Sequence, residues 1–454
     1  MRKLLVANRG EIAVRVIRAA KGLGLETVQV HSAADAEMLA ARMADEVVDI
    51  GPPHAAKSYL NVAAILDAAR QTGADAIHPG YGFLSENADF AQAVAEAGLI
   101  FVGPDAATIR LMGDKAAARQ QAAKAGVPTV PGSDGVIADL DAAAQLAAEI
   151  GFPVMIKAAA GGGGRGIRVA EDAADFRTLA QQAATEAKAA FGDGGIYVEK
   201  VIPRARHAEV QILGDGAEAI HLWDRECSLQ RRRQKVWEEG PSAALDDETR
   251  AALCASAADL ARSVGYKGAG TVEYLYDDAT GAFYFIEMNT RIQVEHPVTE
   301  MITGVDLVAE MIRIADGGKV PAGAIPLEGH AIEVRLNAED PANNFMPFPG
   351  VVSALSVPEM DSVRFDHMLY EGYAIPPFYD SLLGKLIVHG PDRAAALAKL
   401  KEALAVLRIE GLATTKPLFE DLLEDPDVRA NAVHTKWLEP WLDTRNTDQG
   451  DHAA

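Results

Sequence analysis

The sequence has little cysteine and no long apolar run. Only two of the 454 residues are cysteines, Cys227 and Cys254, and their spacing fits neither a disulfide framework nor a zinc site. The apolar run near the N-terminus, Leu4–Ala7, is too short for a signal peptide, and no later stretch is long enough to cross a membrane. These absences exclude a disulfide-stapled secreted domain and a membrane-spanning protein, so we expect a chain of the reducing cytoplasm.

Basic residues are also in short supply. The sequence has 43 Lys and Arg against 65 Asp and Glu, which gives a net charge of -22. Such an acidic chain is a poor partner for nucleic acid or an anionic membrane, although a local basic pocket for a phosphate remains compatible with it. Hydrophobic residues make up 49% and charged residues 24%, the ordinary balance of a globular protein, and the length predicts two to four domains.

The first hundred residues alternate strand and helix patterns, which predicts a parallel, doubly wound α/β sheet. The expected strands are Leu4–Ala7, Thr27–Val30, Val47–Ile50, Ala76–His78 and Leu99–Val102, and the expected helices are Ile12–Leu23, Asn61–Arg70 and Asn87–Ala97. Ligands of such sheets bind at the carboxyl ends of the strands, where Asn8–Gly10 and His78–Gly82 lie. The GxGxxG fingerprint is missing after the first strand, which argues against a dinucleotide site.

A second region begins near Gly113. Residues 153–200 predict a compact α+β unit, and four later strand patterns are joined in pairs by short turns, as in antiparallel hairpins. These pairs are Ala208–Leu213 with Ala219–Trp223 and Thr271–Tyr276 with Phe283–Met288. A third region starts near Gly329 with a strand at Ala331–Leu336, and the polar tail after Trp441 is expected to fray.

The first chemically informative element is a lysine that a strand delivers to a glycine-rich loop. Lys157 ends a strand, Gly161–Gly164 follow it, and a second strand returns at Ile167–Ala170. Glycines let backbone N–H groups converge on phosphate oxygens, and the lysine adds a positive charge. A plain hairpin is the alternative, but it needs only two to five loop residues. The pattern therefore predicts a phosphate-binding loop that is not of the Walker A type, since no Gly-Lys-Ser/Thr follows.

Two carboxylates interrupt neighbouring apolar strands. Glu273 lies in one strand of the second predicted hairpin and Glu287 in the other, and Asn289 shares a face with Glu287 because strand side chains alternate. Two carboxylates and an amide oxygen suit a hard cation such as magnesium, which proteins hold with one or two carboxylates plus substrate phosphates. The alternative, two solvated edge-strand glutamates, fits Glu273 better than Glu287.

Polar residues at alternate positions extend this element. If the segment after Asn289 is extended, Arg291, Gln293 and Glu295 project into one cleft beside the metal. An arginine can bind a small oxyanion in a bidentate manner, and a carboxylate can act as a base.

A basic run, Gln230-Arg231-Arg232-Arg233-Gln234-Lys235, stands apart in this acidic chain. Any single arginine of the run is best interpreted as solvated. The run as a whole favours a local anion pocket over nucleic-acid binding.

Taken together, these motifs resemble biotin carboxylase, a family of ATP-grasp enzymes. The resemblance rests on NRGEIAVR, SYL, IHPGYGFLSEN, GDK at Gly113–Lys115, KAAAGGGGRGI, QRRRQK, GAGTVEY, FIEMNTRIQVEHPVTE and NAEDP, in this order over nearly the whole chain. It implies an α/β and α+β multidomain fold. The expected parts are a Rossmann-like N-terminal domain (1–113), an ATP-grasp domain (114–328) with a mobile lid at about 131–201, a biotin carboxylase C-terminal domain (329–442) and a polar tail (443–454).

The resemblance also implies roles, position by position. The ATP-binding residues would be Lys115, Lys157, Gly161, Gly162, Gly163, Gly164, Glu199, Lys200, Ile202, His207 and Gln230. The metal, magnesium or manganese, would bind at Glu273, Glu287 and Asn289. Bicarbonate would bind at Arg291, Gln293, Val294, Glu295 and Lys235, with Glu295 as the base, and Arg335 would stabilise the biotin enolate. The catalytic set would thus be Glu295, Arg335, Lys235 and Arg291.

In the family's reaction, deprotonated bicarbonate attacks the γ-phosphate of ATP to give carboxyphosphate, and biotin then captures the carboxyl group. The sequence contains no Met-Lys-Met attachment site, so we expect biotin to arrive on a separate biotin carboxyl carrier protein. Carboxyltransferase subunits are the other expected partners, acetyl-CoA is the expected final acceptor, and we expect a homodimer. The sequence departs from the family at Ala160, where many members have glycine, and at Arg233, where several have histidine.

Two alternatives remain open. Another ATP-grasp ligase, which joins a carboxylate to an amine, would cleave ATP in response to that amine and be indifferent to biotin. A non-catalytic nucleotide-binding subunit would bind nucleotide without turnover. Arg335, two residues before NAEDP, argues against the first alternative, and the intact block from Glu287 to Glu295 argues against the second.

Overall fold

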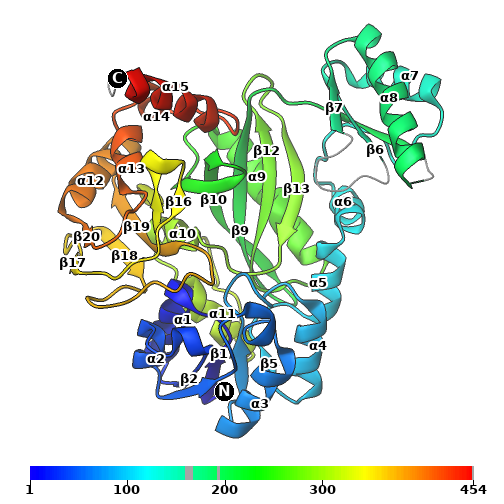
Figure 1. The fold of residues 1–454 in the computed structure, drawn as a ribbon. Coiled ribbons are helices and arrows are strands. Elements are labelled where there is room, and N and C mark those ends of the chain that lie inside the picture. Colours follow the sequence, from blue (N-terminus) through cyan, green and yellow to red (C-terminus); the bar gives the residue numbers. More distant parts are fainter. Residues whose placement is uncertain (159–166, 192–194, 452–454) are drawn as a thin grey trace.

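The computed structural model describes residues 1–158, 167–191 and 195–451. Its N-terminal region, a small three-stranded unit and a long antiparallel sheet surround a central opening in the ribbon, with the N-terminal region at the bottom of Figure 1 and the small unit at its upper right. No helix among the described residues is long and apolar enough to span a membrane.

The N-terminal region is a parallel sheet, as predicted. Its strand order is β3-β2-β1-β4-β5. The strands are β1 (Lys3–Val6), β2 (Glu26–His31), β3 (Glu46–Asp49), β4 (Ala76–His78) and β5 (Ile100–Phe101), and the helices are α1 (Gly10–Gly22), α2 (Leu39–Met43), α3 (Val62–Thr72), α4 (Ala88–Glu96) and α5 (Ala106–Gly113). The order reverses at β1, so the segments after β1 and β4 flank a crevice suited to a ligand.

Local sequence explains the helices of this region. In α3, the side chain of Asn61 accepts a hydrogen bond from the backbone of Ala64 and so caps the helix, and Gly73 ends it with a φ of +65° that favours glycine. In α1, the apolar residues Ile12, Val16 and Ile17 are buried in the core.

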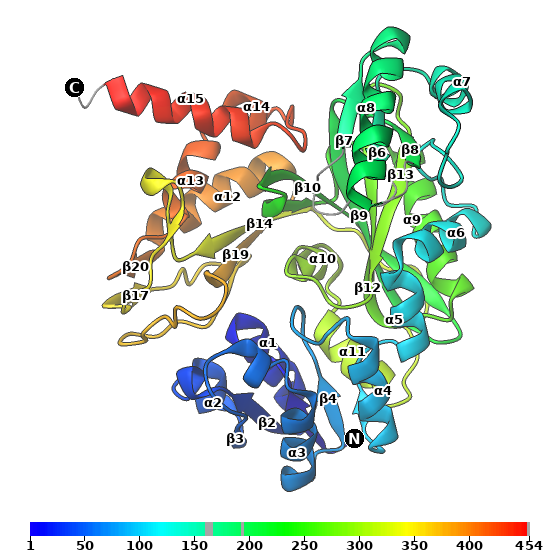
Figure 2. The ribbon, with the colours of Figure 1, turned by 45° about the vertical axis from the view of Figure 1, so that its right-hand side comes forward.

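The small unit consists of a three-stranded sheet, order β7-β6-β8, covered by two helices. Its elements are α7 (Leu140–Ile150), β6 (Val154–Ala158), β7 (Ile167–Ala170), α8 (Ala173–Phe191) and β8 (Ile196–Lys200), and α6 (Lys115–Lys124) precedes it. Figures 1 and 2 both show this unit standing away from the C-terminal region, beside the edge of the long sheet at β13.

The long sheet has the order β13-β12-β9-β10-β11-β14-β19-β18. Its strands are β9 (Ala205–Asp215), β10 (Ala219–Arg231), β11 (Gln234–Gly240), β12 (Lys267–Asp277), β13 (Phe283–Asn289), β14 (His330–Asn337), β18 (Val363–His367) and β19 (Leu382–Gly390). The registers of β9 with β10 and of β12 with β13 confirm the two predicted antiparallel hairpins. The sheet continues across β11 and β14, so strands of the middle and C-terminal regions share one surface.

Helices pack on both faces of this sheet. They are α9 (Asp247–Ser263), α10 (His296–Thr303), α11 (Leu307–Ala315) and α12 (Arg393–Val406). The short helix α10 contacts β10, β11, β14 and β19, and Figure 2 shows it at the centre of the molecule. The segment that leads into α10 carries the candidate residues Gln293 and Glu295.

The C-terminal region ends in a helix rather than a frayed tail, which corrects the expectation from composition. The remaining elements are β15 (Glu339–Asp340), β16 (Met346–Pro347), β17 (Ala354–Ser356), β20 (Arg408–Glu410), α13 (Lys416–Leu422), α14 (Pro426–Arg429) and α15 (Leu438–Asp451). Side chains anchor α15: the indole of Trp441 donates to Asp425 Oδ2 at 2.8 Å, and Arg445 pairs with Asp421 at 2.5 Å. A polar composition does not reveal such anchoring contacts.

Candidate functional site

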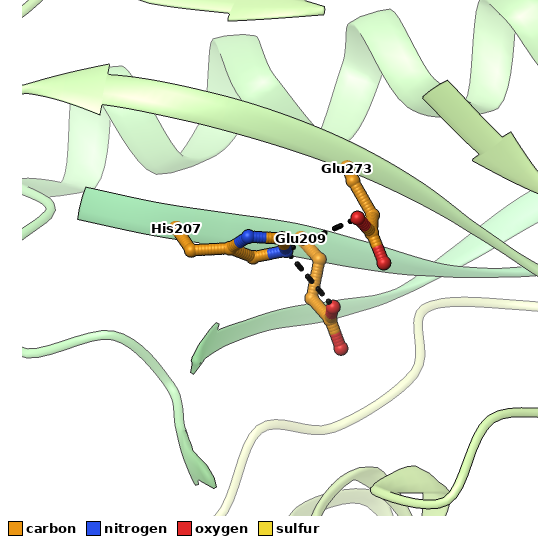
Figure 3. Close-up of side chains that lie close together, drawn as sticks. All are labelled: His207, Glu209 and Glu273. Carbon is orange, nitrogen blue, oxygen red and sulfur yellow. Dashed lines mark ion pairs between the residues drawn. The ribbon is translucent and has the colours of Figure 1, made fainter. Parts of the chain in front are cut away.

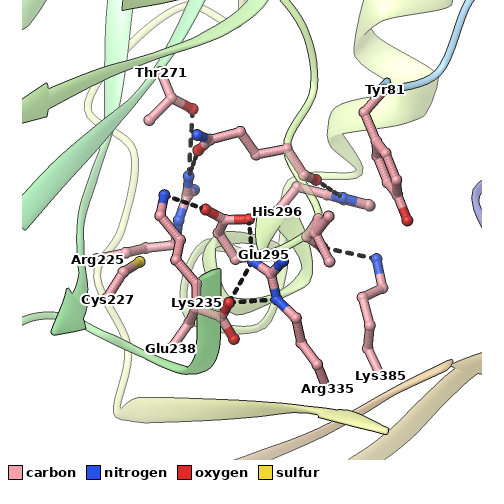
Figure 4. A network of polar contacts seen from close by, with 12 residues as sticks. Tyr81, Arg225, Cys227, Lys235, Glu238, Thr271, Glu295, His296, Arg335 and Lys385 are labelled. Atoms are coloured by element: carbon pink, nitrogen blue, oxygen red, sulfur yellow. Dashed lines mark hydrogen bonds and ion pairs between the residues drawn. The ribbon is translucent and has the colours of Figure 1, made fainter. Parts of the chain in front are cut away.

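One face of the long sheet carries a cluster of buried charged side chains. Lys235 of β11 lies at its centre and donates to Glu209 Oε2 at 2.5 Å, to Glu273 Oε1 at 3.0 Å and to Glu295 Oε1 at 2.6 Å. Glu209 lies on β9 and Glu273 on β12, so one ammonium group joins the strands of the middle region to the segment before α10. Figure 4 shows Lys235, Glu295 and Arg335 converging.

The carboxylate of Glu295 is held at both oxygens. Its Oε1 accepts from Lys235, and its Oε2 accepts from Arg335 Nη2 at 3.0 Å. Burial opposes the charged form of Glu295, but the positive charges of Lys235 and Arg335 outweigh it and lower the pKa. Glu295 is therefore an ionised, positioned carboxylate that can accept a proton from a bound substrate.

Arg335 projects from β14 and has a second carboxylate partner. Its Nε donates to Glu238 Oε1 at 2.6 Å, and Glu238 is fully buried. Burial and the nearby charge of Glu295 raise the pKa of Glu238 to about 7, although Arg335 opposes that shift. Glu238 thus fixes the guanidinium of Arg335 beside Glu295.

His207 lies beside the two carboxylates Glu209 and Glu273 (Figure 3). Its Nε2 is 3.3 Å from Glu273 Oε2 and 3.5 Å from Glu209 Oε2. Burial and Lys235 oppose a charged imidazole, but Glu273 and Glu209 outweigh them and raise the pKa of His207 to about 9. The ring is therefore a cation at neutral pH.

The residues expected to hold a metal lie on adjacent strands. Glu273 and Glu287 are directly opposite in the register of β12 with β13, and Asn289 Nδ2 donates to Glu273 Oε1 at 2.9 Å. Among the described residues, two further groups have a spacing that could hold an ion, His207–Glu209–Glu273 and Glu209–Cys227–Glu295. Lys235 donates to carboxylates of both groups, Glu273 included, whereas the side chain of Glu287 is 39% exposed, so a magnesium ion beside Glu273 would rely on Glu287 for an open oxygen.

The residues expected to bind ATP are more dispersed. Lys157 on β6 pairs with Glu199 on β8, Lys115 begins α6 with its Nζ 3.6 Å from Glu287 Oε2, and Ile202 is buried. Lys200 donates to the backbone oxygen of Gly151 at 2.8 Å. Gln230 Nε2 lies 3.3 Å from His207 Nδ1, and this contact joins the expected ATP-binding residues to the charged cluster. The glycines Gly161–Gly164 and the departure Ala160 lie outside the described residues.

The segment after Asn289 differs from the extended strand that its alternation suggested. It turns into α10: Gln293 and Glu295 contact the charged cluster, and Arg291 lies at its edge, between Asn289 and Glu86. Gln293 Nε2 donates to Glu273 Oε1 at 2.8 Å, whereas Arg291 Nε donates to Glu86 of the N-terminal region at 2.9 Å. The guanidinium of Arg291 also donates to Asn289 Oδ1 at 3.1 Å, which keeps it near the metal residues.

The basic run is a hairpin turn. Arg232 and Arg233 are exposed and have φ angles of +49° and +65°, and they connect β10 to β11. Arg231 lies over the ring of Phe345, 3.7 Å from its centroid. These contacts replace the expected anion pocket of the whole run, because only Lys235 and Gln230 turn toward the cluster.

Sequence reasoning missed several members of the cluster. Arg225 is fully buried and donates to Glu209 Oε1 at 2.7 Å and to Gln293 Oε1 at 2.9 Å. A usable signal was present in β9, where His207, Glu209 and Gln211 place a polar residue at every second position of an otherwise apolar strand. For Arg225 and Glu238 no comparable local pattern exists, because their partners come from distant strands.

A cavity of about 130 Å³ lies next to this cluster, between the N-terminal and C-terminal regions. Its lining includes Asn8, Arg9 and Glu11 from the segment after β1, Tyr81 from the segment after β4, and Asp380. This is the crevice at the point where the strand order reverses. Figure 4 shows Tyr81 on the side of the network where Lys385 lies, with its hydroxyl toward Lys385.

Comparisons with known proteins match this architecture. Family models match residues 1–109 (biotin carboxylase, N-terminal domain), residues 114–322 (carbamoyl-phosphate synthase L chain, ATP binding domain) and residues 333–440 (biotin carboxylase C-terminal domain). The biotin carboxylase of Pseudomonas aeruginosa is 52% identical over 446 residues, which cover 97% of this chain and 99% of the relative. This chain belongs to the biotin carboxylase family. The predicted family and the predicted enzyme class, a biotin carboxylase ligase, are thereby confirmed.

Further relatives in the biotin carboxylase family agree. Biotin carboxylase 1 of Bacillus subtilis is 51% identical and covers 97% of this chain and 99% of its own length. The crystal structure of a biotin carboxylase–βγ-ATP complex from Campylobacter jejuni has a TM-score of 0.86 at 46% identity and covers 96% of this chain and 98% of that one. A Hydrogenobacter thermophilus 2-oxoglutarate carboxylase biotin carboxylase domain dimer, with MgADP, ADP and bicarbonate, has a TM-score of 0.84 at 46% identity and covers 97% of each chain.

Proposed function

We propose that this chain uses ATP and bicarbonate to carboxylate biotin through carboxyphosphate. The observation that carries the proposal is Glu295, a buried carboxylate whose oxygens are held by Lys235 of the middle region and Arg335 of the C-terminal region. A base fixed between two cations is suited to take a proton from an anionic substrate and to retain that substrate electrostatically.

In the first step, bicarbonate would occupy the space beside Glu295, Gln293, Val294 and Arg291. Glu295 takes the bicarbonate proton, and the resulting oxyanion attacks the γ-phosphorus of ATP and releases ADP. The ammonium of Lys235 stays beside the negative charge that develops. The proton moves to Glu295, and the γ-phosphoryl group moves from ATP to the bicarbonate oxygen with ADP as the leaving group.

In the second step, carboxyphosphate breaks down to phosphate and carbon dioxide. The phosphate takes the proton of biotin N1′, and N1′ then attacks the carbon dioxide. Arg335 would stabilise the negative charge on the ureido oxygen, because its guanidinium remains charged at any working pH. The cavity lined by Tyr81 and Asp380, on the side of the site that faces the N-terminal region, would admit the biotin ring toward Arg335.

The nucleotide would lie between the small unit and the edge of the long sheet. Lys157, Lys115, Glu199 and His207 supply its charged surroundings, and Glu273 with Glu287 would hold magnesium, which neutralises phosphate charge when bound. We propose a division at about 113, 328 and 442, with a lid at residues 131–201; the separate position of the small unit in Figures 1 and 2 supports the lid. A closing lid would exclude water from the reactive phosphates.

The partners follow from the reaction. Biotin would be presented by a carrier protein, and carboxyltransferase subunits would pass the carboxyl group to an acyl-CoA, with acetyl-CoA as our choice. The biotin carboxylase domain dimer of the Hydrogenobacter relative supports a homodimer for this chain.

An ADP-release assay with and without bicarbonate and free biotin tests the proposal. We expect release that requires bicarbonate and carboxybiotin that accumulates when biotin is added. Release that requires an amine and ignores biotin would favour another ATP-grasp ligase, and nucleotide binding without release would favour a non-catalytic subunit.

A further inference from the structure

A buried lysine of the C-terminal region contacts the backbone of the candidate base. Lys385 lies on β19, and none of its side chain is exposed. Its Nζ donates to the backbone oxygen of Val294 at 2.8 Å and lies 3.3 Å from Glu11 Oε2 of the N-terminal region. Figure 4 shows Lys385 extending toward this segment from the side opposite Lys235.

The surroundings of Lys385 argue against a purely structural role. In the sheet register it lies opposite Arg335 on β14 and Asp366 on β18, and Arg364 already pairs with Asp366. Glu333, fully buried on β14, has no hydrogen-bond partner for either carboxyl oxygen among the described residues. Taking two charges out of water is costly, and a pair of apolar side chains in place of Lys385 and Glu11 would avoid that cost. Stability alone therefore does not require this buried pair.

The hydrogen bond from Lys385 to Val294 fixes the orientation of one peptide unit. The carbonyl of Val294 belongs to the planar peptide that joins Val294 to Glu295, so its orientation sets where the Glu295 side chain begins. On the other side, the backbone oxygen of Glu295 accepts from Val298 N at 3.2 Å at the start of α10. Lys235 and Arg335 then fix the far end of the side chain.

The same ammonium also reaches the wall of the cavity. Glu11 accepts a hydrogen bond from the hydroxyl of Tyr81 and pairs with Lys385, and both Glu11 and Tyr81 line the cavity of about 130 Å³. Lys385 thus touches the N-terminal region on one side and the segment with the base on the other.

We propose that Lys385 is a positioning residue that orients the Val294–Glu295 peptide, and through it the base Glu295, against the cavity wall built by Glu11 and Tyr81. This inference rests on the proposed function, because it assigns Lys385 a task in bicarbonate activation. Lys385 touches no reacting atom and acts only through Val294 and Glu11.

Steady-state kinetics of Lys385→Met test the proposal. Methionine keeps the length and apolar packing but removes the donor to Val294. We expect bicarbonate-dependent ADP release to fall roughly ten- to hundred-fold, the scale for misplacing a catalytic group by a fraction of an ångström to one ångström. The KM for bicarbonate should rise and the KM for ATP should stay close to wild type, since the nucleotide residues lie on other elements. Lys385→Arg keeps a charged donor and should recover part of the lost rate.

Two further variants separate positioning from stability. Lys416 of the same region also donates to a backbone oxygen, that of Leu407 at 2.9 Å, so Lys416→Met is a matched control that should keep the wild-type rate. The double variant Lys385→Met with Glu11→Gln removes the buried charge left unpaired and should regain thermal stability without regaining the rate.

The outcomes are distinct. A double variant that regains both stability and rate would show that Lys385 only balances Glu11, and it would overturn the proposal. An unchanged rate and bicarbonate KM in Lys385→Met would do the same. If the wild-type chain itself releases no ADP in response to bicarbonate, the proposed function fails first, whatever the variants show.

Discussion

Glu295 and Glu287 lie in the same candidate site, yet their surroundings differ. The side chain of Glu295 is 3% exposed and bonded at both oxygens to cations of two regions, whereas that of Glu287 is 39% exposed and lies 3.6 Å from Lys115. The lysines follow the same division. The side chain of Lys235 is 13% exposed and lies among three carboxylates, while that of Lys157 is 34% exposed and that of Lys115 is 88% exposed.

The difference shows how the two ends of the site are prepared. At the carboxyl-transfer end, around Lys235, Glu295 and Arg335, the fold has already taken the charges out of water and paired them, so little reorganisation is left for the reaction. At the nucleotide end, around Lys115, Lys157 and Glu287, the charges still face solvent. They can form new ion pairs with phosphates and a metal ion when these bind. Variants at the two ends should therefore fail in different ways.

The largest effect is expected at the carboxyl-transfer end. Glu295→Ala should remove both bicarbonate-dependent ADP release and carboxybiotin formation, with a loss of roughly 100- to 10,000-fold, the scale for a positioned base. Both products can be measured in one reaction mixture. The exposed Glu424 supplies a control, because Glu424→Gln should leave both rates unchanged. Near-normal ADP release in Glu295→Ala would remove the base from the mechanism.

At the nucleotide end, Glu287→Gln and Lys157→Ala should each reduce ATP turnover by roughly 100-fold or more, the scale for losing one preorganised electrostatic contact. The loss in Glu287→Gln should shrink as the magnesium concentration is raised, because Glu273 and Asn289 remain and a higher concentration offsets weaker binding, whereas the loss in Lys157→Ala should not. Magnesium titrations of both variants measure this. ATP turnover near the wild-type rate in both variants would refute the assignment of Glu287 to the metal and of Lys157 to the ATP phosphates.

Arg335→Ala should uncouple ATP cleavage from the carboxylation of biotin. Glu295 keeps Lys235 in this variant, so much of the ADP release should persist, while carboxybiotin is lost because the ureido oxyanion has no partner. The quantity to measure is the ratio of ADP to carboxybiotin, which should rise well above that of the wild type. A wild-type ratio would mean that Arg335 does not serve the biotin step.

The comparison also shows what local sequence can reveal. The parallel N-terminal sheet and both hairpins could be predicted, because alternation and turn residues are encoded within a few positions. Glu273 and Glu287 were paired correctly for the same reason, since one short turn sets their register. The match of long motifs to a known family predicted the rest of the architecture.

Long-range register and turns resisted prediction. Arg225, Glu238 and Lys385 join the cluster only because β10, β11 and β19 become parts of one sheet whose order brings together strands far apart in the sequence. The alternation that grouped Arg291, Gln293 and Glu295 applies to strands, whereas this segment turns before α10 and Arg291 contacts both Asn289 and Glu86. Composition likewise predicted a frayed tail, where Trp441 and Arg445 anchor a helix.

The smallest expected effect concerns a buried charge outside the site. It tests whether ion pairing determines how much that charge contributes to folding stability. Glu239 on β11 is bonded to Arg393 at 2.5 Å and to His330 at 2.8 Å. Burial opposes its charge, but His330 and Arg393 outweigh burial and lower the pKa of Glu239 to about 2. Because the folded pKa lies below the unfolded one, this carboxylate stabilises the fold above about pH 4.5, and the contribution is lost as the pH falls toward 2. This difference in pKa between the folded and unfolded states corresponds to roughly 3 kcal/mol.

Glu239→Gln should therefore lower the melting temperature at pH 7, and its difference in melting temperature from the wild type should narrow as the pH is lowered from 5 to 3. Glu424→Gln, in an exposed pair, should change it little at any pH. If the melting temperature of Glu239→Gln stays below that of the wild type by the same amount across this pH range, then packing, and not the paired charge, accounts for the lost stability.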